Sequence, residues 1–233
     1  MLFKKKKIEF AVIIEVRSTS SRLPKKHLKK ILNKTVIEYM IERLKYSKLL
    51  DDIIVSTTIN KTDDELVELL KKNNIKYFRG SEDDVLLRVL ETAKFFNVEN
   101  IVEIPGDCPL IDSYYIDLYI KEFKEKGVDY LSSGLSKNFP NGFEVQIFPT
   151  KVLSNVEKKT NCKIDREHVT LFIYNNPDLF KICSIPSPFN LKYKNIKLTL
   201  DTEEDLKLIT KIIKEFYPMN KKFGLTEIIN KFF

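Results

Sequence analysis

The stretch IIEVRSTSSRLPKKHL (residues 13–28) begins as an apolar run and then becomes polar and cationic. Residues 13–16 are typical of the end of a buried strand. The hydroxyls and cations that follow are Arg17, Ser18, Thr19, Ser20, Ser21, Arg22, Lys25 and Lys26. A triphosphate needs hydroxyls, cations and backbone N–H groups around it, because its negative charges must be neutralised. The stretch therefore favours a phosphate-binding loop over an exposed loop that binds nothing.

This loop lacks the glycines of two common nucleotide-binding motifs. Neither GxxxxGK[ST] nor GxGxxG occurs in the chain. The sequence therefore lacks the signature of an ordinary P-loop and that of a dinucleotide-binding fold.

The composition is that of an ordinary globular protein, with 43% hydrophobic and 31% charged residues. The 233 residues can bury a substantial core. The net charge of +7 suggests a nucleic-acid partner, but the lysines are scattered and mostly accompanied by acidic residues. We therefore expect no nucleic-acid binding. We interpret residues 1–7, which include the run Lys4 to Lys7, as a flexible basic leader.

Cysteine usage and hydropathy favour the cytoplasm. The three cysteines form no CxxC motif, which argues against a disulfide framework and a thiolate metal site. The apolar run at 8–16 is short and contains Glu9 and Glu15, so it supports neither a signal peptide nor a membrane span. We expect a cytoplasmic protein with no membrane partner.

Strand-like and helix-like segments alternate up to about residue 133. The predicted strands are 8–16, 52–58, 75–78 and 100–104, and the predicted helices begin near Thr35, at Thr62 as an N-cap, and at Ser81. This order with short connections predicts an α/β fold, with a single-domain, mostly parallel Rossmann-like sheet flanked by helices. After residue 133 we expect strands at 142–148, 179–185 and 195–200, a helix over 165–176 capped by Asp165, and final helices from 201.

Polar clusters fall at the predicted carboxyl ends of four strands, where ligands bind in such sheets. These clusters are residues 17–26, 56–60, 79–84 and 106–112. We therefore expect them to share one site.

Two aspartates follow apolar segments. Asp107 lies between Gly106 and Pro109, where a carboxylate is well placed to hold Mg²⁺ with phosphate partners. Asp201 follows residues 196–200 and, taken alone, favours the N-cap of the next helix. Together with the cationic loop, the two aspartates favour a shared metal.

Several motifs resemble those of one family. RSTSSRLPKKHL (17–28), PGDCPLID (105–112) and LDTEEDL (200–206) resemble the RxxSTRLPGKxL, QGDxPLI and DTPEDL segments of the CMP-sugar synthetases. These include the CMP-KDO and acylneuraminate cytidylyltransferases. With FRGSEDDVLLR (78–88) and DREHVT (165–170), nearly the whole chain is still more similar to the spore-coat-polysaccharide-type branch of cytidylyltransferases.

The resemblance implies a nucleotide-diphospho-sugar transferase-like fold over residues 1–233 that binds CTP and Mg²⁺. It assigns Arg17, Ser20, Ser21, Arg22 and Lys26 to the triphosphate. It assigns Asp107 and Asp201 to the metal, and makes Arg22, Lys26 and Asp107 catalytic. Thr57, Gly80, Ser81 and Asp84 would surround the base and ribose. It also implies a homodimer, with about 134–195 as an inserted region that covers the acceptor and mediates dimerisation.

The implied reaction is transfer of CMP from CTP to a sugar acid, with release of pyrophosphate, in surface polysaccharide or glycoconjugate biosynthesis. The acceptor oxygen would attack the α-phosphorus in line, and catalysis would be mainly positioning and electrostatics. The candidate acceptor residues are Asn141, Glu144, Gln146, Arg166 and His168. Arg166 could pair with an acceptor carboxylate. The alternative is structural, with Glu144 on the solvent face and Arg166 and His168 as ordinary helix residues.

The sequence also departs from the family pattern. Lys25, His27 and Pro105 stand where Gly, Pro and Gln are usual. The sugar-binding ExxEQLR segment of the KDO enzymes has no counterpart, since DREHVTLFIY occupies that part of the chain. We therefore expect an acceptor pocket that differs from the KDO pocket.

Three other functions fit parts of the sequence. The same loop would serve an enzyme whose acceptor is a sugar, polyol or other small-molecule phosphate. A glycosyltransferase that uses a nucleotide-sugar has the same kind of sheet, but GDC at 106–108 is not a DxD-like pair. A family member that binds nucleotide without turnover is disfavoured by the presence of Lys26 and both aspartates.

Overall fold

The computed structural model describes residues 6–136, 139–186, 188 and 193–233. Most of the predicted leader, residues 1–5, lies outside the described residues. So do residues 137–138, 187 and 189–192 of the predicted inserted region.

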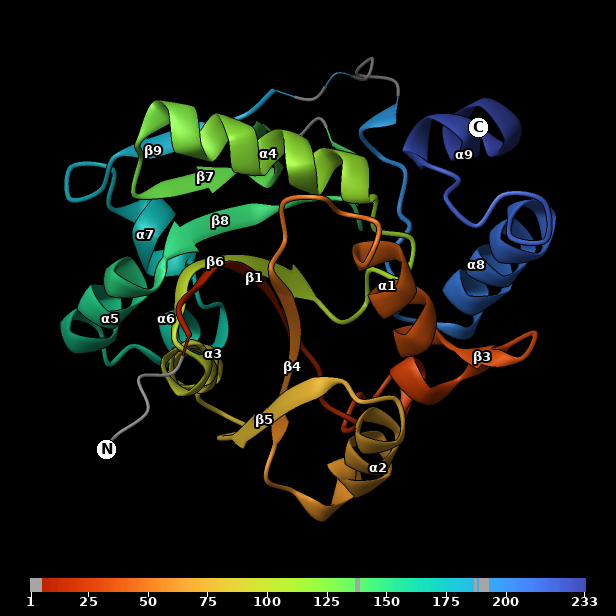
Figure 1. Ribbon diagram of the computed structural model, residues 1–233, viewed down its shortest axis with the longest axis horizontal. Helices are drawn as coiled ribbons and strands as arrows, with labels where there is room; N and C mark the ends of the chain where they lie inside the picture. The colour runs from red at the N-terminus through yellow and green to blue at the C-terminus, as the bar shows by residue number, and fades with distance from the viewer. Residues whose placement is uncertain (1–5, 137–138, 187, 189–192) are drawn as a thin grey trace.

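The predicted mostly parallel sheet is confirmed (Figure 1). Seven strands lie in the order β5-β4-β1-β6-β8-β7-β9. Their bounds are β1 Ile8–Glu15, β4 Asp52–Thr58, β5 Lys76–Gly80, β6 Val98–Pro105, β7 Tyr130–Ser132, β8 Gln146–Pro149 and β9 Ile182–Ser184. β1 pairs in parallel with β4 and β6, and β4 with β5. β8 runs antiparallel to both β6 and β7, so the change of direction comes after residue 133. β2 (Lys30–Ile31) and β3 (Lys34–Thr35) form a separate short hairpin.

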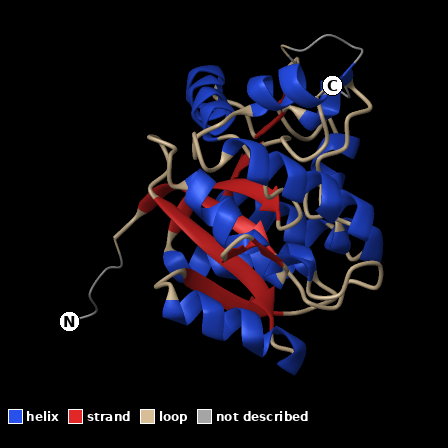
Figure 2. Ribbon diagram, turned by 90° about the vertical axis from the view of Figure 1, so that its right-hand side faces the viewer, coloured by secondary structure: helices blue, strands red, loops and turns tan. Residues whose placement is uncertain are grey.

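Helices cover both faces of the sheet (Figure 2). They are α1 Val36–Leu44, α2 Asp64–Lys72, α3 Val85–Phe96, α4 Ser113–Lys126, α5 Thr150–Lys159, α6 Lys163–Glu167, α7 Leu171–Asn175, α8 Glu203–Phe216 and α9 Leu225–Phe232. Val12 and Ile14 of β1 pack with α1, α2, α4, α8 and α9. Ala11 and Ile13 face the other way and pack with α3, α5 and α7. Because both faces of β1 are buried, its centre is a continuous apolar run.

Two predicted helix starts are wrong. Thr62 does not cap α2, since a 3₁₀ turn at Lys61–Asp63 precedes this helix and Asp63 takes the N-cap position. Ser81 does not open α3, because Asp84 is its N-cap and accepts a hydrogen bond from a first-turn backbone N–H. In both places several polar residues precede the helix, and only their tertiary contacts decide which of them caps it.

The predicted helix over 165–176 is two short helices, α6 and α7. Between them Val169 is fully buried and has a φ of 34°, which a continuous right-handed helix does not allow. Asp165 is not a cap either, because it lies inside α6 and accepts a hydrogen bond from Thr160. This break turns the chain after α6 back towards the sheet.

Two strand predictions also need correction. The strand expected at 142–148 begins only at Gln146, and residues 195–200 form no regular strand. Gly142 has a φ of 99°, and a Cβ there would lie 2.8 Å from the carbonyl carbon of Leu198. The two segments therefore meet in close backbone contact through one isolated parallel bridge, between Asn141 and Lys197, in place of the regular strands that alternation predicts.

Candidate active site

A cavity of about 960 Å³ opens at the carboxyl ends of β1 and β6. Two of the four strand-end clusters, residues 17–26 and 106–112, contribute to its lining, whereas residues 56–60 and 79–84 do not. Eleven of the predicted site residues line it: Arg17, Ser20, Ser21, Arg22, Lys26, Asp107, Asn141, Glu144, Gln146, His168 and Asp201. The lining does not include Thr57, Gly80, Ser81, Asp84 or Arg166.

One end of the cavity centres on Lys26. Its ammonium lies 3.2 Å from Oδ2 of Asp107 and 3.1 Å from Oδ1 of Asp201. Arg22 reaches the same oxygen of Asp201 at 3.2 Å. We call these four residues, with the loop 17–26, the cationic end.

Asp201 is a shared carboxylate, not a helix cap. Thr202 caps α8 in a capping box with Asp205. Asp201 instead forms ion pairs with Lys26, Arg22 and Lys197. Partial burial alone would raise the pKa of Asp201, but Lys26 and Lys197 outweigh it and lower the pKa below its ordinary value.

Gly106 brings Asp107 to this end. Its N–H donates a 2.9 Å hydrogen bond to the carbonyl of Glu15. A Cβ at this position would lie 2.7 Å from that carbonyl oxygen and 2.6 Å from Cγ2 of Val16. Only glycine allows β6 to leave the sheet so close to β1, which sets Asp107 beside the loop.

Asp63 holds the loop from behind. Its carboxylate is fully buried and accepts hydrogen bonds from the Ser18 N–H at 2.7 Å and the Thr57 hydroxyl at 2.9 Å. It also accepts from the N–H and the hydroxyl of Thr58. Burial alone would raise the pKa of Asp63, but the hydrogen bonds outweigh it and lower the pKa. Thr57 thus supports the loop through Asp63, and Thr57 itself does not line the cavity.

His27 supports the loop from a second side. The imidazole is 1% exposed, and its Nε2 lies 3.3 Å from Oγ of Ser18. Burial lowers the pKa of His27 to about 4, so the ring is neutral at pH 7. Sequence reasoning noted His27 only as a departure from the family pattern.

Asp84 and Arg166 pair with each other instead of contacting the cavity. Arg166 Nε lies 3.0 and 2.9 Å from the two carboxylate oxygens of Asp84, and its Nη1 donates to the Glu157 carbonyl. This pair joins α3 to α6. Both side chains are occupied by this pair, and the expectations that Arg166 meets an acceptor carboxylate and that Asp84 meets the ribose stay predictions.

Gly80 and Ser81 also serve packing. A Cβ at Gly80 would lie 2.9 Å from Cγ of Arg88, so the glycine makes room for that side chain. The Ser81 carbonyl accepts a hydrogen bond from Arg88, and the Ser81 hydroxyl accepts one from the Asp84 N–H.

The predicted acceptor residues outside α6 line the cavity opposite the loop. Gln146 accepts hydrogen bonds from the Thr170 hydroxyl at 2.7 Å and from the Tyr130 hydroxyl. Glu144 accepts a 2.6 Å hydrogen bond from the Gly142 N–H, and burial raises its pKa.

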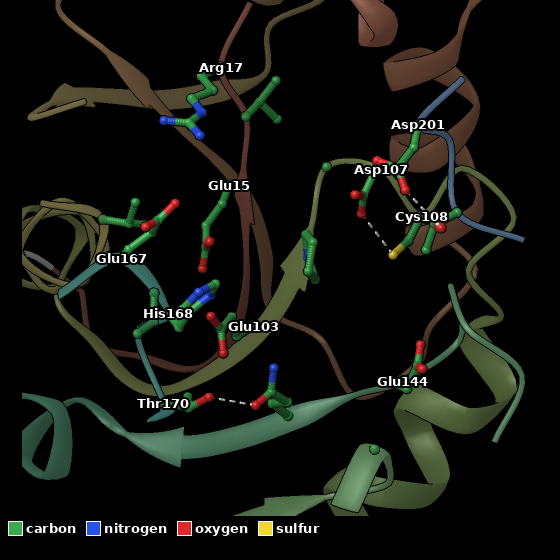
Figure 3. Close-up of a pocket in the computed structure, with 18 of the residues that line it drawn as sticks. Glu15, Arg17, Glu103, Asp107, Cys108, Glu144, Glu167, His168, Thr170 and Asp201 are labelled. Atoms are coloured by element: carbon green, nitrogen blue, oxygen red, sulfur yellow. Dashed lines mark hydrogen bonds between the residues drawn. The ribbon is translucent and has the colours of Figure 1, made fainter. Parts of the chain in front are cut away.

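Sequence reasoning did not assign the buried Glu103 or the partly buried Glu15, which lie near His168. Figure 3 shows Glu15, Glu103 and His168 gathered on one side of the cavity, away from Asp107 and Asp201. Burial raises the pKa of Glu15, and burial with the neighbouring Glu15 raises that of Glu103 well above its ordinary value. We call Glu15, Glu103 and Glu167, which line this side of the cavity, the acidic end, whereas Glu144 lies apart from them in Figure 3. In the sequence, the signal that could have revealed Glu15 and Glu103 is that each is an acidic residue inside an otherwise apolar strand.

The cationic end fits a magnesium ion through two carboxylates. Among the described residues no group of three or more His, Cys, Asp or Glu side chains could hold a metal. Asp107 and Asp201 nevertheless converge on one cation, the Lys26 ammonium. Mg²⁺ usually binds one or two carboxylates together with substrate phosphates, so this pair suits it.

The helices in the described part of the chain include none that is long and apolar enough to cross a membrane.

Comparisons with known proteins show the family of this chain. Residues 11–225 match the family model described as cytidylyltransferase. A solved cytidylyltransferase from Leptospira borgpetersenii is 31% identical, with a TM-score of 0.89 over 96% of this chain and 93% of that one. The uncharacterized protein MJ1063 of Methanocaldococcus jannaschii is 41% identical over 208 residues, which are 89% of this chain and 84% of that protein.

Two further relatives have descriptive names. The spore coat polysaccharide biosynthesis protein SpsF of Bacillus subtilis is 29% identical over 84% of this chain and 83% of its own length. The 3-deoxy-manno-octulosonate cytidylyltransferase of Solibacter usitatus is 30% identical over 75% of this chain and 74% of its own length.

Proposed function

This chain belongs to the cytidylyltransferase family and is a nucleotidyltransferase, and from that premise we propose that it transfers CMP from CTP to a sugar acid and releases pyrophosphate. The observation that carries the proposal is the position of Lys26 between Asp107 and Asp201. This arrangement combines a cationic loop, which suits phosphates, with two carboxylates, which suit a metal.

The loop would bind the β- and γ-phosphates. Arg22 and Lys26 would stabilise the negative charge that builds on the leaving pyrophosphate. Both cations are already held at the cavity by ion pairs with Asp201. Asp63 and His27 would fix the backbone of the loop through Ser18.

Asp107 and Asp201 would hold Mg²⁺ together with the phosphates. When bound, the ion supplies charge neutralisation at the phosphates and orients them. Lys26 would then exchange its carboxylate partners for phosphate oxygens.

The sugar-acid acceptor is supported by the names of two relatives. One is a 3-deoxy-manno-octulosonate cytidylyltransferase and one is a spore coat polysaccharide biosynthesis protein. The acceptor would bind beside Asn141, Glu144, Gln146 and His168, which line the cavity opposite the loop. We further propose a cytoplasmic enzyme, and a homodimer in which residues 134–195 cover the acceptor.

The test is pyrophosphate release with Mg²⁺, each of the four nucleoside triphosphates, and a panel of 2-keto sugar acids, sugar phosphates and polyol phosphates. We expect release with CTP and a sugar acid, reduced on the order of 10²-fold or more in Asp107→Ala. Asp178→Ala, which changes an exposed aspartate outside the cavity, is the matched control. Release with a sugar or polyol phosphate alone would replace the sugar acid by a phosphate acceptor. Binding of no triphosphate would contradict the proposal.

A further inference from the structure

The Gln146 side chain is held by two hydroxyl groups. Its Oε1 accepts hydrogen bonds from the Thr170 hydroxyl at 2.7 Å and from the Tyr130 hydroxyl. An amide oxygen has two lone pairs, so these two donors use both of them. Figure 3 shows the Thr170 bond on the same side of the cavity as His168 and Glu103. The oxygen of the amide is therefore turned away from any ligand.

The nitrogen of the same amide is open to the cavity. Within the described residues, Nε2 of Gln146 donates no hydrogen bond. It is also not among the buried polar atoms that lack a partner, so it is accessible from the cavity that Gln146 lines. An amide nitrogen carries two N–H groups, and both can therefore donate to a ligand.

The two hydroxyls need the amide oxygen as their acceptor. Tyr130 is 1% exposed and Thr170 is 3% exposed, and buried polar groups are almost always hydrogen-bonded. Burial raises the pKa of Tyr130, although the Thr170 and Ser132 hydroxyls act to lower it, so the phenol keeps the proton that it donates. Turning the amide over would place its N–H groups against both hydroxyls and take away their shared acceptor.

Two distant parts of the chain bring these hydroxyls together. Ser132 of β7 lies opposite Gln146 of β8, so Tyr130, two residues before Ser132, projects from the same face of the sheet. Thr170 follows Val169, which is fully buried and has a φ of 34°. A left-handed backbone at a β-branched residue is strained, and such strain is often found at functional sites. The turn at Val169 brings the Thr170 hydroxyl into contact with the start of β8.

We propose that Tyr130 and Thr170 are positioning residues for the acceptor, because they hold the Gln146 amide so that its N–H groups donate to oxygen atoms of the sugar acid. This inference rests on the proposed function and adds two residues that act through a third. It also gives the segment DREHVT (165–170) a role, since its last residue orients the amide.

An amide that is fixed in advance serves binding in two ways. The entropy cost of ordering the Gln146 side chain is met in folding and not when the acceptor arrives. An acceptor analogue that lacks the matching oxygen leaves the N–H donors unpaired, so the site rejects it. We expect these effects on the sugar acid and not on CTP, because Gln146 lines the cavity opposite the loop that we assign to the phosphates.

The test is the steady-state kinetics of pyrophosphate release with CTP and the sugar acids of the panel, beginning with 3-deoxy-manno-octulosonate. Gln146→Met removes the amide donors at similar size and adds no charge. We expect the KM for the sugar acid to rise about tenfold, and the KM for CTP to stay within about twofold of the wild-type value.

A pair of variants at Thr170 then tests the positioning role. Thr170→Val removes the hydroxyl at nearly the same size and should raise the KM for the sugar acid about threefold or more. Thr170→Ser keeps a hydroxyl and should restore the wild-type value. In the Gln146→Met background, Thr170→Val should add less than about twofold, because no amide is left to orient. Tyr130→Phe should behave like Thr170→Val in both backgrounds.

Thr150→Val is the matched control, because the Thr150 hydroxyl donates to the Val98 carbonyl at 2.7 Å and lies outside the cavity lining. It should leave both KM values unchanged. The inference is overturned by an unchanged sugar-acid KM in Gln146→Met or by equal effects of Thr170→Val in the two backgrounds. A rise in the KM for CTP as large as that for the sugar acid would overturn it too.

CTP titrated by calorimetry without an acceptor separates the two proposals. If CTP binds normally and a sugar acid is used, any of these contrary results rejects only the role of Tyr130 and Thr170. Absent CTP binding, or release with no sugar acid, rejects the proposed function and this inference with it.

Discussion

The two ends of the cavity differ in how their charged side chains are paired. At the cationic end, Lys26, Arg22, Asp107 and Asp201 already have partners before any ligand arrives. At the acidic end, the carboxyl groups of Glu15 and Glu103 pair with each other, and burial raises the pKa of both. The first end is organised in advance for a group of fixed charge, which is how electrostatic catalysis gains most. The second end holds two acids whose ionisation is disfavoured by burial, so its charge depends on the pH.

Removing the central cation should produce the largest effect. In Lys26→Met, Asp107 and Asp201 lose their shared partner and the phosphates lose a positive charge. We expect kcat for pyrophosphate release to fall about 10²- to 10³-fold, the loss typical of one preorganised stabilising group. Lys71→Met is the control, because Lys71 is exposed, lies outside the cavity lining and pairs with Glu68 at 2.8 Å. Equal activity of the two variants would show that catalysis does not need Lys26.

Acid should weaken the fold through His27. The unfolded chain takes up this proton near pH 6.5, whereas burial lowers the folded pKa to about 4. The stabilisation is therefore complete above pH 6.5 and is lost as the pH falls towards 4. It amounts to about 3 kcal/mol. Urea unfolding from pH 7.5 to 4 should show this slope in the wild type and lose it in His27→Asn. His168→Asn, which changes an exposed histidine, should keep it.

Weakening the hydrogen bonds of Asp63 to the loop should have a smaller effect on stability and on CTP binding. In Asp63→Asn, one acceptor oxygen becomes an amide donor, which then faces either the Ser18 N–H or the N–H and hydroxyl of Thr58. We expect the free energy of unfolding to fall by about 1–3 kcal/mol. The KM for CTP should rise about tenfold, which corresponds to roughly 1.4 kcal/mol. Asp64→Asn, at an exposed aspartate paired with Arg79, should change neither value much.

Neutralising Glu103 should raise the free energy of unfolding, and this effect should be the smallest of the four. Burial and Glu15 raise the pKa of Glu103 well above its ordinary value, so the folded chain keeps a proton that the unfolded chain releases. Stability is thus lost as the pH rises above the ordinary glutamate value. Glu103→Gln removes this loss, and we expect a gain of about 1 kcal/mol at pH 8 and less at pH 5. A loss of stability at both pH values would show that the carboxyl group is needed for packing.

Local patterns predicted the sheet and one end of the cavity. The apolar runs of the first four long strands are visible in the sequence because both faces of a parallel sheet are covered. The rule that ligands bind at strand ends then brought Lys26 and Asp107 together. Their approach depends on Gly106, whose need for close backbone contact follows from the fold and not from the neighbouring residues.

Tertiary contacts account for what the sequence could not reveal. Asp63 is like any acid in a first helical turn, but its partner Ser18 lies 45 residues away. Val169 breaks the helix expected at 165–176 because its side chain is buried while its backbone is left-handed. Glu15 and Glu103 each stand out in an apolar strand, but only the register of β1 and β6 makes them neighbours.

The ion pairs of Lys26 also bear on when the protein acquires its activity during folding. They span 81 residues to Asp107 and 175 residues to Asp201. Contacts between such distant segments carry the entropy cost of closing long loops and form late. In refolding experiments, helical circular dichroism should therefore return before pyrophosphate release does. During synthesis, a nascent chain that has not yet reached Asp201 can build β1 to β6 and still leave Lys26 with only one of its two carboxylate partners.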